Sequence, residues 1–321
     1  MATLAGLALL GPVGAHAADI NLSLGSCPVG CTAYTWSAGI ADVINREVKG
    51  VRATAEETKG YVENIKLLQR GEMEAAMATS LSSYQAYSGT GTFSGGKKGE
   101  ILSWMAITPV AMHVVTLADS PIKTWPTSRA SGSAWGSRRH LDARCRFDDG
   151  DARAQARYRL QAVPGAPWQH DGHAGRWQPG CGAVERQLPA SPLKKLTSQR
   201  EIRLLPVPQP VFDKHQAAYP PYFRVTIPGK LYEGVTQDTP TFGLANGLVI
   251  LKSVPENLVY DMTKAVFENL GKLKGVHPAF GRVSKDTVLN GFGAPLHPGA
   301  LKYYREIGVP GIEEFVARTS R

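Results

Sequence analysis

Residues 20–34 read INLSLGSCPVGCTAY, and this stretch decides the fold class. Its first five residues form a short apolar strand, its remainder is a loop of small residues, and residues 35–48 have the apolar spacing of an amphipathic helix. The same order then repeats, with expected strands at 51–57 and 74–79 and expected helices at 61–70 and 82–87. Strand, loop and helix in this order predict an α/β protein with a mainly parallel sheet covered by helices.

Two long apolar segments further along the chain predict a second lobe. Residues 101–117 give two strand-like runs broken at Pro109, and residues 240–252 give another strand, followed by an amphipathic helix at 255–270. Two extended segments that flank a central insert are what two lobes joined by crossing strands require. The predicted division places residues 19–108 and 252–321 in lobe 1 and residues 109–251 in lobe 2.

Composition excludes several classes of protein. The chain has 321 residues, of which 43% are hydrophobic and 20% charged, and its mean hydropathy is −0.18. These values exclude a polytopic membrane protein and a disordered chain. Residues 1–18, MATLAGLALLGPVGAHAA, end in the small-residue pattern of a signal-peptidase site and predict export. They lack the leading Lys or Arg of a signal peptide, which a start codon further upstream would supply; the alternative is a buried N-terminal helix.

The centre of the chain has an anomalous composition. Between Thr124 and Leu193 there is no Ile, Lys, Met or Asn, whereas there are ten Arg and four of the six Trp. A structureless stretch of this length is unusual inside a compact domain. One hypothesis is that residues 126–187 are a frame-shifted translation of a GC-rich gene, which leaves lobe 2 incomplete or disordered. The alternative is a disordered, Arg-rich insert.

The formal net charge of +9 invites a nucleic-acid interpretation, but the charge is unevenly placed. The central stretch contributes ten Arg against six acidic residues, and the rest of the chain carries only +5. No nucleic acid is therefore expected as a partner. His170 and His173 resemble part of a metal-binding motif, but they lie in the anomalous stretch. No metal or cofactor is therefore expected. His297 and Pro298 are predicted to start a helix rather than to catalyse a reaction.

Four stretches resemble the TAXI-type solute-binding proteins of TRAP transporters. They are LGS and its following Gly and Tyr at 24–34, GYVEN with LLQRGE at 60–72, QAY with Gly and Phe at 85–93, and PLHPGA with YYREIG at 295–308. The resemblance covers about residues 20–125 and 188–310. It implies a two-lobed, type II periplasmic-binding-protein fold. It also implies a monomeric periplasmic receptor, not an enzyme, that captures a small organic anion (an amino acid or a carboxylate) for the TRAP membrane subunits.

The centre departs from the family. After residues 120–125 the family continues with a turn, a strand and a Gly-Ser-Gly-Thr ligand loop, and none of these is present here. The departure coincides with the anomalous composition. Since lobe 2 lacks this loop, the chain as written is expected to bind its ligand weakly.

The candidate site consists of three turns that follow three expected strands. Open α/β sheets bind ligands at the carboxyl ends of their strands, and a helix start offers unpaired N–H groups to an anion. Each turn taken alone is equally well explained as a tight turn, and the pair Cys27 and Cys31 leaves a small-ring disulfide open. The predicted ligand-binding residues are Gly25, Ser26, Gly30, Tyr34, Gly60, Tyr61, Asn64, Thr79 and Ser80.

Two other functions remain open. The main alternative is an extracellular enzyme or ligand sensor built on the same two-lobed scaffold, although no Ser/His/Asp order, P-loop or pair of carboxylates points to a reaction. Neighbouring genes discriminate between these functions, because TRAP permease genes favour transport. A basic nucleic-acid-binding protein is the third possibility, and it depends on the Arg-rich centre.

Overall fold

The computed structural model describes residues 20–120, 122–124 and 181–319, with only the backbone described for residues 181–184. The expected signal peptide at 1–18 lies outside the described residues. So does most of the segment at 126–187, together with His170 and His173. These expectations, and the expected state of lobe 2 in that segment, stay predictions.

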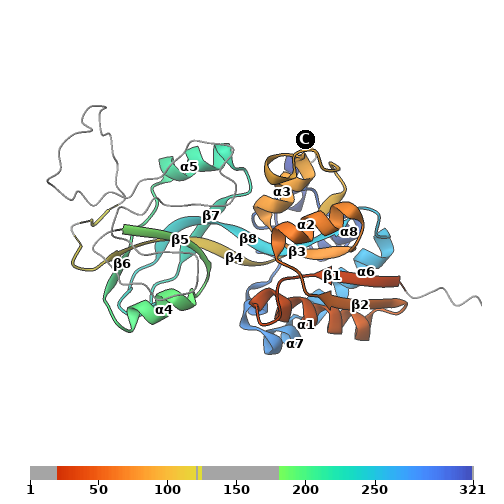
Figure 1. The fold of residues 1–321 in the computed structure, drawn as a ribbon, viewed down its shortest axis with the longest axis horizontal. Coiled ribbons are helices and arrows are strands. Elements are labelled where there is room, and N and C mark those ends of the chain that lie inside the picture. The colour runs from red at the N-terminus through yellow and green to blue at the C-terminus, as the bar shows by residue number, and fades with distance from the viewer. Residues whose placement is uncertain (1–19, 121, 125–180, 320–321) are drawn as a thin grey trace, which may run out of the picture.

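The described strands form one mixed sheet that runs through both lobes (Figure 1). Its main path has the order β2 (Val51–Glu56), β1 (Ile20–Gly25), β3 (Ala75–Thr79), β8 (Thr239–Leu251), β4 (Ile101–Leu117) and β5 (Cys181–Gln187). Two further strands pair off this path, β6 (Ile202–Leu204) with β4 and β7 (Phe223–Ile227) with β8. The long strands β4 and β8 pass together from one lobe into the other. The expected two-lobed α/β fold with crossing strands is confirmed.

The expectation of a mainly parallel sheet is wrong. Only β1 with β2 and β1 with β3 pair in parallel among the described strands, and every other ladder is antiparallel. The reason is that β8 returns from lobe 2 and inserts between β3 and β4, in the direction opposite to both. Strand–helix alternation in the first eighty residues reports only the parallel part of the sheet.

The expected break at Pro109 is also absent, because β4 is one strand of 17 residues. Pro109 aligns with Ala245 of β8, and the ladder with β8 continues on both sides of it. On the opposite edge, β5 begins to pair only at Val110. Pro109 thus lies where β4 acquires a new neighbour, a position at which a missing N–H group disturbs the sheet least.

Glycines let the two crossing strands approach closely. A Cβ atom at Gly243 would clash with the carbonyl oxygen of Val110, and one at Gly247 would clash with that of Met105. These contacts with backbone atoms have no room to relax. The close approach therefore requires glycine at both positions of β8.

Lobe 1 is built from both ends of the described chain. Trp104 lies fully buried in β4, donates a hydrogen bond from its indole to Thr263 (2.9 Å) and accepts one at its carbonyl from Tyr304 (2.9 Å). The core is covered by helices α1 (Thr32–Glu47), α2 (Tyr61–Arg70), α3 (Ser80–Ser88), α6 (Glu256–Glu268), α7 (Leu270–Val276), α8 (Pro298–Glu306) and α9 (Ile312–Thr319), with short 3-10 turns at Gly91–Phe93 and Pro278–Arg282.

Two expected helix boundaries are confirmed in this lobe. Helix α2 has the predicted bounds and ends at Gly71, whose φ of 73° is the left-handed conformation that stops a helix. Helix α8 begins at Pro298, with the His297 ring accepting a hydrogen bond from the N–H of Gly299 (3.2 Å). His297 therefore caps a helix, as expected.

Lobe 2 has its own core around β4, β6, β7 and β8, with helices α4 (Ser191–Thr197) and α5 (Gln209–Ala218). A series of buried hydrogen bonds crosses this core. His113 Nδ1 lies 2.9 Å from the Ala111 carbonyl, and its Nε2 lies 2.8 Å from the Tyr232 hydroxyl, which also accepts from the N–H of Ala190 (2.7 Å). Since a carbonyl can only accept, Nδ1 carries the proton and Tyr232 donates to Nε2. This chain fixes the segment that enters α4.

Lobe 2 is expected to lose stability in acid because of His215. Its ring lies among aromatic rings, 4.4 Å from Tyr222 and 4.7 Å from Phe242 between centroids, and burial lowers its pKa to about 4. Below the ordinary histidine pKa, His215 binds a proton in the unfolded chain but stays neutral in the folded chain. The free energy of unfolding therefore falls as the pH drops from about 6.5 to about 4. Since the ring is only partly buried, we expect a loss of about 1–2 kcal/mol.

The variant His215→Phe isolates this contribution. Urea unfolding at about pH 7 and about pH 4.5 should give a smaller difference for the variant than for the natural chain, because the variant cannot take up the proton. An equal difference in the two proteins would show that His215 does not carry the effect.

Candidate functional site

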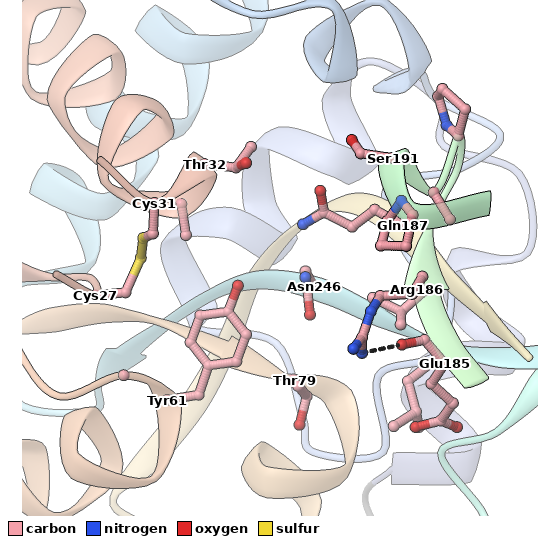
Figure 2. Close-up of a pocket in the computed structure, with 17 residues that line it drawn as sticks. Cys27, Cys31, Thr32, Tyr61, Thr79, Glu185, Arg186, Gln187, Ser191 and Asn246 are labelled. Atoms are coloured by element: carbon pink, nitrogen blue, oxygen red, sulfur yellow. Dashed lines mark hydrogen bonds between the residues drawn. A yellow bond between two sulfur atoms is a disulfide. The ribbon is translucent and has the colours of Figure 1, made fainter. Parts of the chain in front are cut away.

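A cleft of about 560 Å³ lies between the two lobes, where the crossing strands pass (Figure 2). Its lobe 1 wall consists of the starts of α1 and α2 and the end of β3. Its floor and lobe 2 wall consist of β4, β5, β8 and the segment that enters α4. The lining residues are Cys27, Cys31, Thr32, Ala33, Gly60, Tyr61, Thr79, Val110, Glu185, Arg186, Gln187, Pro189, Ala190, Ser191, Pro192, Leu244 and Asn246.

The start of α1 opens into this cleft. A disulfide joins Cys27 and Cys31, and Cys31 is the N-cap residue, with its sulfur 3.4 Å from the N–H of Tyr34. Thr32 and Ala33 occupy the first turn, where N–H groups have no partner within the helix. This 16-residue helix therefore presents N–H donors, the positive end of its dipole and the Thr32 hydroxyl to the cleft.

The start of α2 lies beside it. Gly60 is the N-cap residue, has a φ of 106° that favours glycine, and makes no side-chain cap. The first-turn N–H groups are thus left for water or for a ligand. The Tyr61 hydroxyl points into the cleft (Figure 2), and burial raises its pKa to about 12. Tyr61 consequently remains a protonated hydrogen-bond donor at neutral pH.

The third turn is already satisfied by its own side chains. The Thr79 hydroxyl accepts a hydrogen bond from the N–H of Ser82 (3.1 Å), and the Ser82 hydroxyl accepts one from the N–H of Thr79 (3.1 Å). Ser80 is fully buried, and its hydroxyl accepts a hydrogen bond from the N–H of Ala245 in β8 (3.1 Å). The start of α3 therefore shapes the wall more than it offers donors.

The buried side chain of Asn64 forms hydrogen bonds with residues at all three turns. Its amide nitrogen donates to the carbonyls of Ser26 (2.7 Å) and Met77 (2.8 Å), and its amide oxygen accepts from the Thr58 hydroxyl (2.7 Å). Gly25 lies against it, since a Cβ there would come within 3.1 Å of the Asn64 oxygen. All of the side-chain hydrogen-bonding atoms of Asn64 are thus used within the protein.

The structure brings the three predicted turns to one wall, but only some of the predicted residues face the cleft. Gly60, Tyr61 and Thr79 line it. The others lie beside or behind the wall: Ser26, Asn64 and Ser80 are fully buried, Gly25 packs on Met73, Tyr34 packs on the lobe 1 core and Gly30 lies in the outer part of the first loop.

Most of the lining residues were not among the predicted ones, and Thr32 and Asn246 are two polar examples. Thr32 was placed in a loop because the helix was expected to begin three residues later. Asn246 was absorbed into an apolar strand, although it is the only polar side chain from Phe242 to Leu251. That isolation was the available signal.

The lobe 2 wall contains one unusual carboxyl group. Burial raises the pKa of Glu185 to about 7, against the opposing effects of a Tyr222 hydrogen bond and the nearby Arg186. One of its carboxyl oxygens is shut off from solvent and has no hydrogen-bond partner within the described part of the chain. Arg186 donates to the Glu185 carbonyl (2.9 Å), as the dashed line in Figure 2 shows. Both residues belong to the compositionally anomalous segment 126–187.

Reduction of the disulfide is expected to weaken the site. The bond between Cys27 and Cys31 closes a ring of five residues, and a constraint of this size contributes about 2 kcal/mol in the chain-entropy model. Treatment with a thiol reductant should lower the melting temperature of lobe 1 and loosen the first turn of α1. The double variant Cys27→Ser, Cys31→Ser provides the matched control, because reductant should leave its melting temperature unchanged.

Residues 24–139 and 148–308 match a family model described as the NMT1-like family. The chain belongs to the NMT1-like family. Its match therefore includes both lobes and is interrupted only at residues 140–147. No helix among the described residues of this NMT1-like protein combines the length and apolar character needed to span a bilayer. The described residues also contain no group of three His, Cys, Asp or Glu side chains placed to hold a metal ion.

Several solved structures resemble the NMT1-like chain at low sequence identity. A TctC solute binding protein from Polaromonas is 14% identical, with a TM-score of 0.45, and the alignment covers 90% of this chain and 98% of that one. XAC2383 from Xanthomonas citri, solved with ATP, is 11% identical, with a TM-score of 0.42 and coverages of 93% and 98%. A structure described as a periplasmic transporter is 14% identical, with a TM-score of 0.40 and coverages of 93% and 94%.

Proposed function

We propose that this NMT1-like protein is a solute-binding receptor of the TAXI type. It is exported to the periplasm, binds a small organic anion as a monomer and delivers it to the membrane subunits of a TRAP transporter. The observation that carries the proposal is the convergence of the α1 and α2 starts on one interlobe cleft. Their unpaired N–H groups, with the Tyr61 hydroxyl, suit a carboxylate. The receptor catalyses no reaction.

Ligand capture in this proposal uses a hinge. Strands β4 and β8 are the continuous elements that pass between the lobes, so small changes of their backbone angles at the crossing reorient one lobe against the other. A ligand held by the α1 and α2 starts contacts lobe 2 only when the cleft is closed. Its additional contacts in that state shift the equilibrium towards closure.

Thermal-shift and ligand-observed NMR measurements with millimolar mono- and dicarboxylates test the proposal. At least one carboxylate should raise the melting temperature and show NMR evidence of binding. Tyr61→Phe should weaken that binding by about fivefold to tenfold, the value of one hydrogen bond. Tyr34→Phe is the matched control, since the Tyr34 ring packs on the lobe 1 core outside the cleft lining, and it should leave binding unchanged. Absence of binding by every carboxylate contradicts the proposal.

The proposal extends to the anomalous segment: residues 126–187 are the product of a shifted reading frame. Their lack of Ile, Lys, Met and Asn supports this origin. The family match is interrupted at 140–147 but includes residues 126–139 and 148–187, and this part of the match counts against a shifted frame. Resequencing the gene is the test. Restoration of a strand–helix pattern in one of the other two frames is the expected result. If neither frame restores it, the segment is a genuine Arg-rich insert. In either case the candidate anion site depends on lobe 1.

A further inference from the structure

The disulfide of the first loop lies on the lobe 1 wall of the cleft. Cys27 and Cys31, which it joins, both line the cavity, as Figure 2 shows. The three residues between them, Pro28, Val29 and Gly30, are exposed. Cys31 is partly exposed, whereas Cys27 is only 8% exposed. A small molecule in the cleft therefore has access to the disulfide, and Cys31 is its more accessible half.

The loop around the disulfide is held by hydrogen bonds that do not depend on it. The N–H of Ser26 donates to the carbonyl of Glu56 (3.0 Å), and the N–H of Cys31 donates to the carbonyl of Pro28 (3.0 Å). The disulfide closes a ring of only five residues, and the constraint that a disulfide imposes grows with the loop it closes. Opening this bond therefore costs the fold less than opening a long-range disulfide would, as reversible exchange requires.

Opening the disulfide leaves a thiol at the start of α1. Cys31 is the N-cap residue of this 16-residue helix, its sulfur lies 3.4 Å from the N–H of Tyr34, and the first turn contains no acidic side chain. A thiolate at this position accepts the Tyr34 N–H as a charged acceptor and faces the positive end of the helix dipole. Both effects lower the pKa of a thiol, and the thiolate is the reactive form of cysteine.

The other titratable groups around the disulfide do not cancel this effect. Glu57 opposes a negative charge, but its carboxylate contacts the exposed part of the loop, where it accepts from the N–H of Val29 (3.2 Å). Tyr61 stays protonated at neutral pH because burial raises its pKa to about 12. Across the cleft, the raised pKa of Glu185 reduces its charge near pH 7, and Arg186 favours a thiolate.

We propose that Cys27 and Cys31 form a thiol–disulfide exchange site for low-molecular-weight thiols. The thiolate of such a compound attacks the Cys31 sulfur and forms a new S–S bond there. The bond between the two cysteines breaks, and its electron pair leaves on the Cys27 sulfur, which takes up a proton and lies 3.8 Å from the Ser26 hydroxyl as an acceptor. The product is a mixed disulfide at Cys31. This inference is independent of the proposed receptor function.

The mixed disulfide has two exits. The Cys27 thiolate attacks the Cys31 sulfur, restores the original bond and releases the small thiol. Alternatively, a second small thiolate attacks the sulfur of the first, so that Cys31 leaves as a thiolate at the α1 start and the two small molecules leave as their disulfide. The site is thus modified reversibly, and its oxidation state follows the thiols around it.

Glutathione is the probe for the natural protein. The full chain is incubated with millimolar reduced glutathione and quenched with acid, and peptide mass spectrometry with fragmentation assigns each adduct to one cysteine. The expected result is a mixed disulfide on Cys31 that disappears when glutathione is removed, because Cys27 displaces it. A disulfide that stays closed, or glutathione attached mainly to Cys27, overturns the proposal.

The variants Cys27→Ser and Cys31→Ser are a matched pair, since each leaves one thiol at the site. Their alkylation rates with iodoacetamide are measured at about pH 6 and about pH 8 by the same mass spectrometry. The rate of an ordinary thiol falls about 75-fold from the higher to the lower pH. For Cys31 in folded Cys27→Ser the fall should be tenfold or less, and unfolding in urea should restore the ordinary fall.

The partner variant tests access to the site. Near pH 6, Cys27 in Cys31→Ser should react at least tenfold more slowly than Cys31 in Cys27→Ser, because Cys27 is buried and lies before the helix start. An ordinary pH dependence of Cys31 in the folded variant, or equal rates for the two thiols, overturns the proposal. Circular dichroism establishes that both variants fold. If one does not, the glutathione experiment on the natural protein decides.

Discussion

Replacing Asn64 with alanine is expected to lower the free energy of unfolding by about 3 kcal/mol and to weaken carboxylate binding at least tenfold. The substitution removes three hydrogen bonds at once, to Ser26, Met77 and Thr58. It leaves the Met77 carbonyl without its side-chain donor in a site that water cannot readily enter. These partners belong to the turns around the cleft. Without the three hydrogen bonds, the starts of α1 and α2 are no longer held in their positions relative to each other.

The matched control for this variant is Asn45→Ala. Asn45 brackets the backbone of Ala53 with two hydrogen bonds, but it lies on α1 and outside the cleft lining. Its replacement should destabilise the protein by about 2 kcal/mol and leave carboxylate affinity unchanged. Urea unfolding and NMR titration measure the two quantities separately. If both variants alter affinity equally, the cleft responds to overall stability and Asn64 has no special role in positioning it.

Replacing Gly299 with alanine is expected to cost about 3 kcal/mol or more of lobe 1 stability. Gly299 lies in the first turn of α8, where it packs directly on the backbone of α6. A Cβ atom would clash with the Glu256 carbonyl, and it would lie 2.6 Å from the Tyr260 nitrogen and 2.9 Å from the Val259 Cβ atom. Backbone atoms of a packed helix cannot move aside, so the two helices must separate.

Gly275→Ala is the control for this substitution. Gly275 lies within helix α7, and a Cβ atom there would meet no atom within 4 Å. Alanine should stabilise the helix by up to about 1 kcal/mol through its better helix propensity. Urea unfolding of the two variants should therefore give changes of opposite sign. A loss at Gly299 that is no larger than the ordinary effect of a surface substitution would contradict the packing explanation.

The local elements of lobe 1 could be predicted because they depend on local signals. Helix α2 has an apolar face and a glycine stop, and β1 and β2 are short runs bounded by turn residues. Strand direction could not be predicted in the same way. β8 pairs with β3 through residues about 170 apart in the sequence, and no feature within either strand indicates which strand lies beside it.

The candidate site was predictable in outline and not in detail. Strand ends carrying Gly, Ser or Thr correctly indicated which turns meet at one wall. Whether a side chain faces the cleft or the interior depends on packing: Asn64 was expected to bind ligand, yet its amide groups bond to the protein. Asn246 shows the converse case, because it was placed in an apolar strand, yet it lines the cleft where β8 lies between β3 and β4.

The assembly of lobe 1 from both ends of the chain has a consequence for biosynthesis. Trp104 is enclosed only when Thr263 and Tyr304 have been made, and these residues come some 160 and 200 positions later. A ribosome-bound precursor that stops short of them exposes a half-covered sheet with an unpaired β3 edge. Such a precursor would be a ready client for holding chaperones, and it would acquire protease resistance only after release of the finished polypeptide.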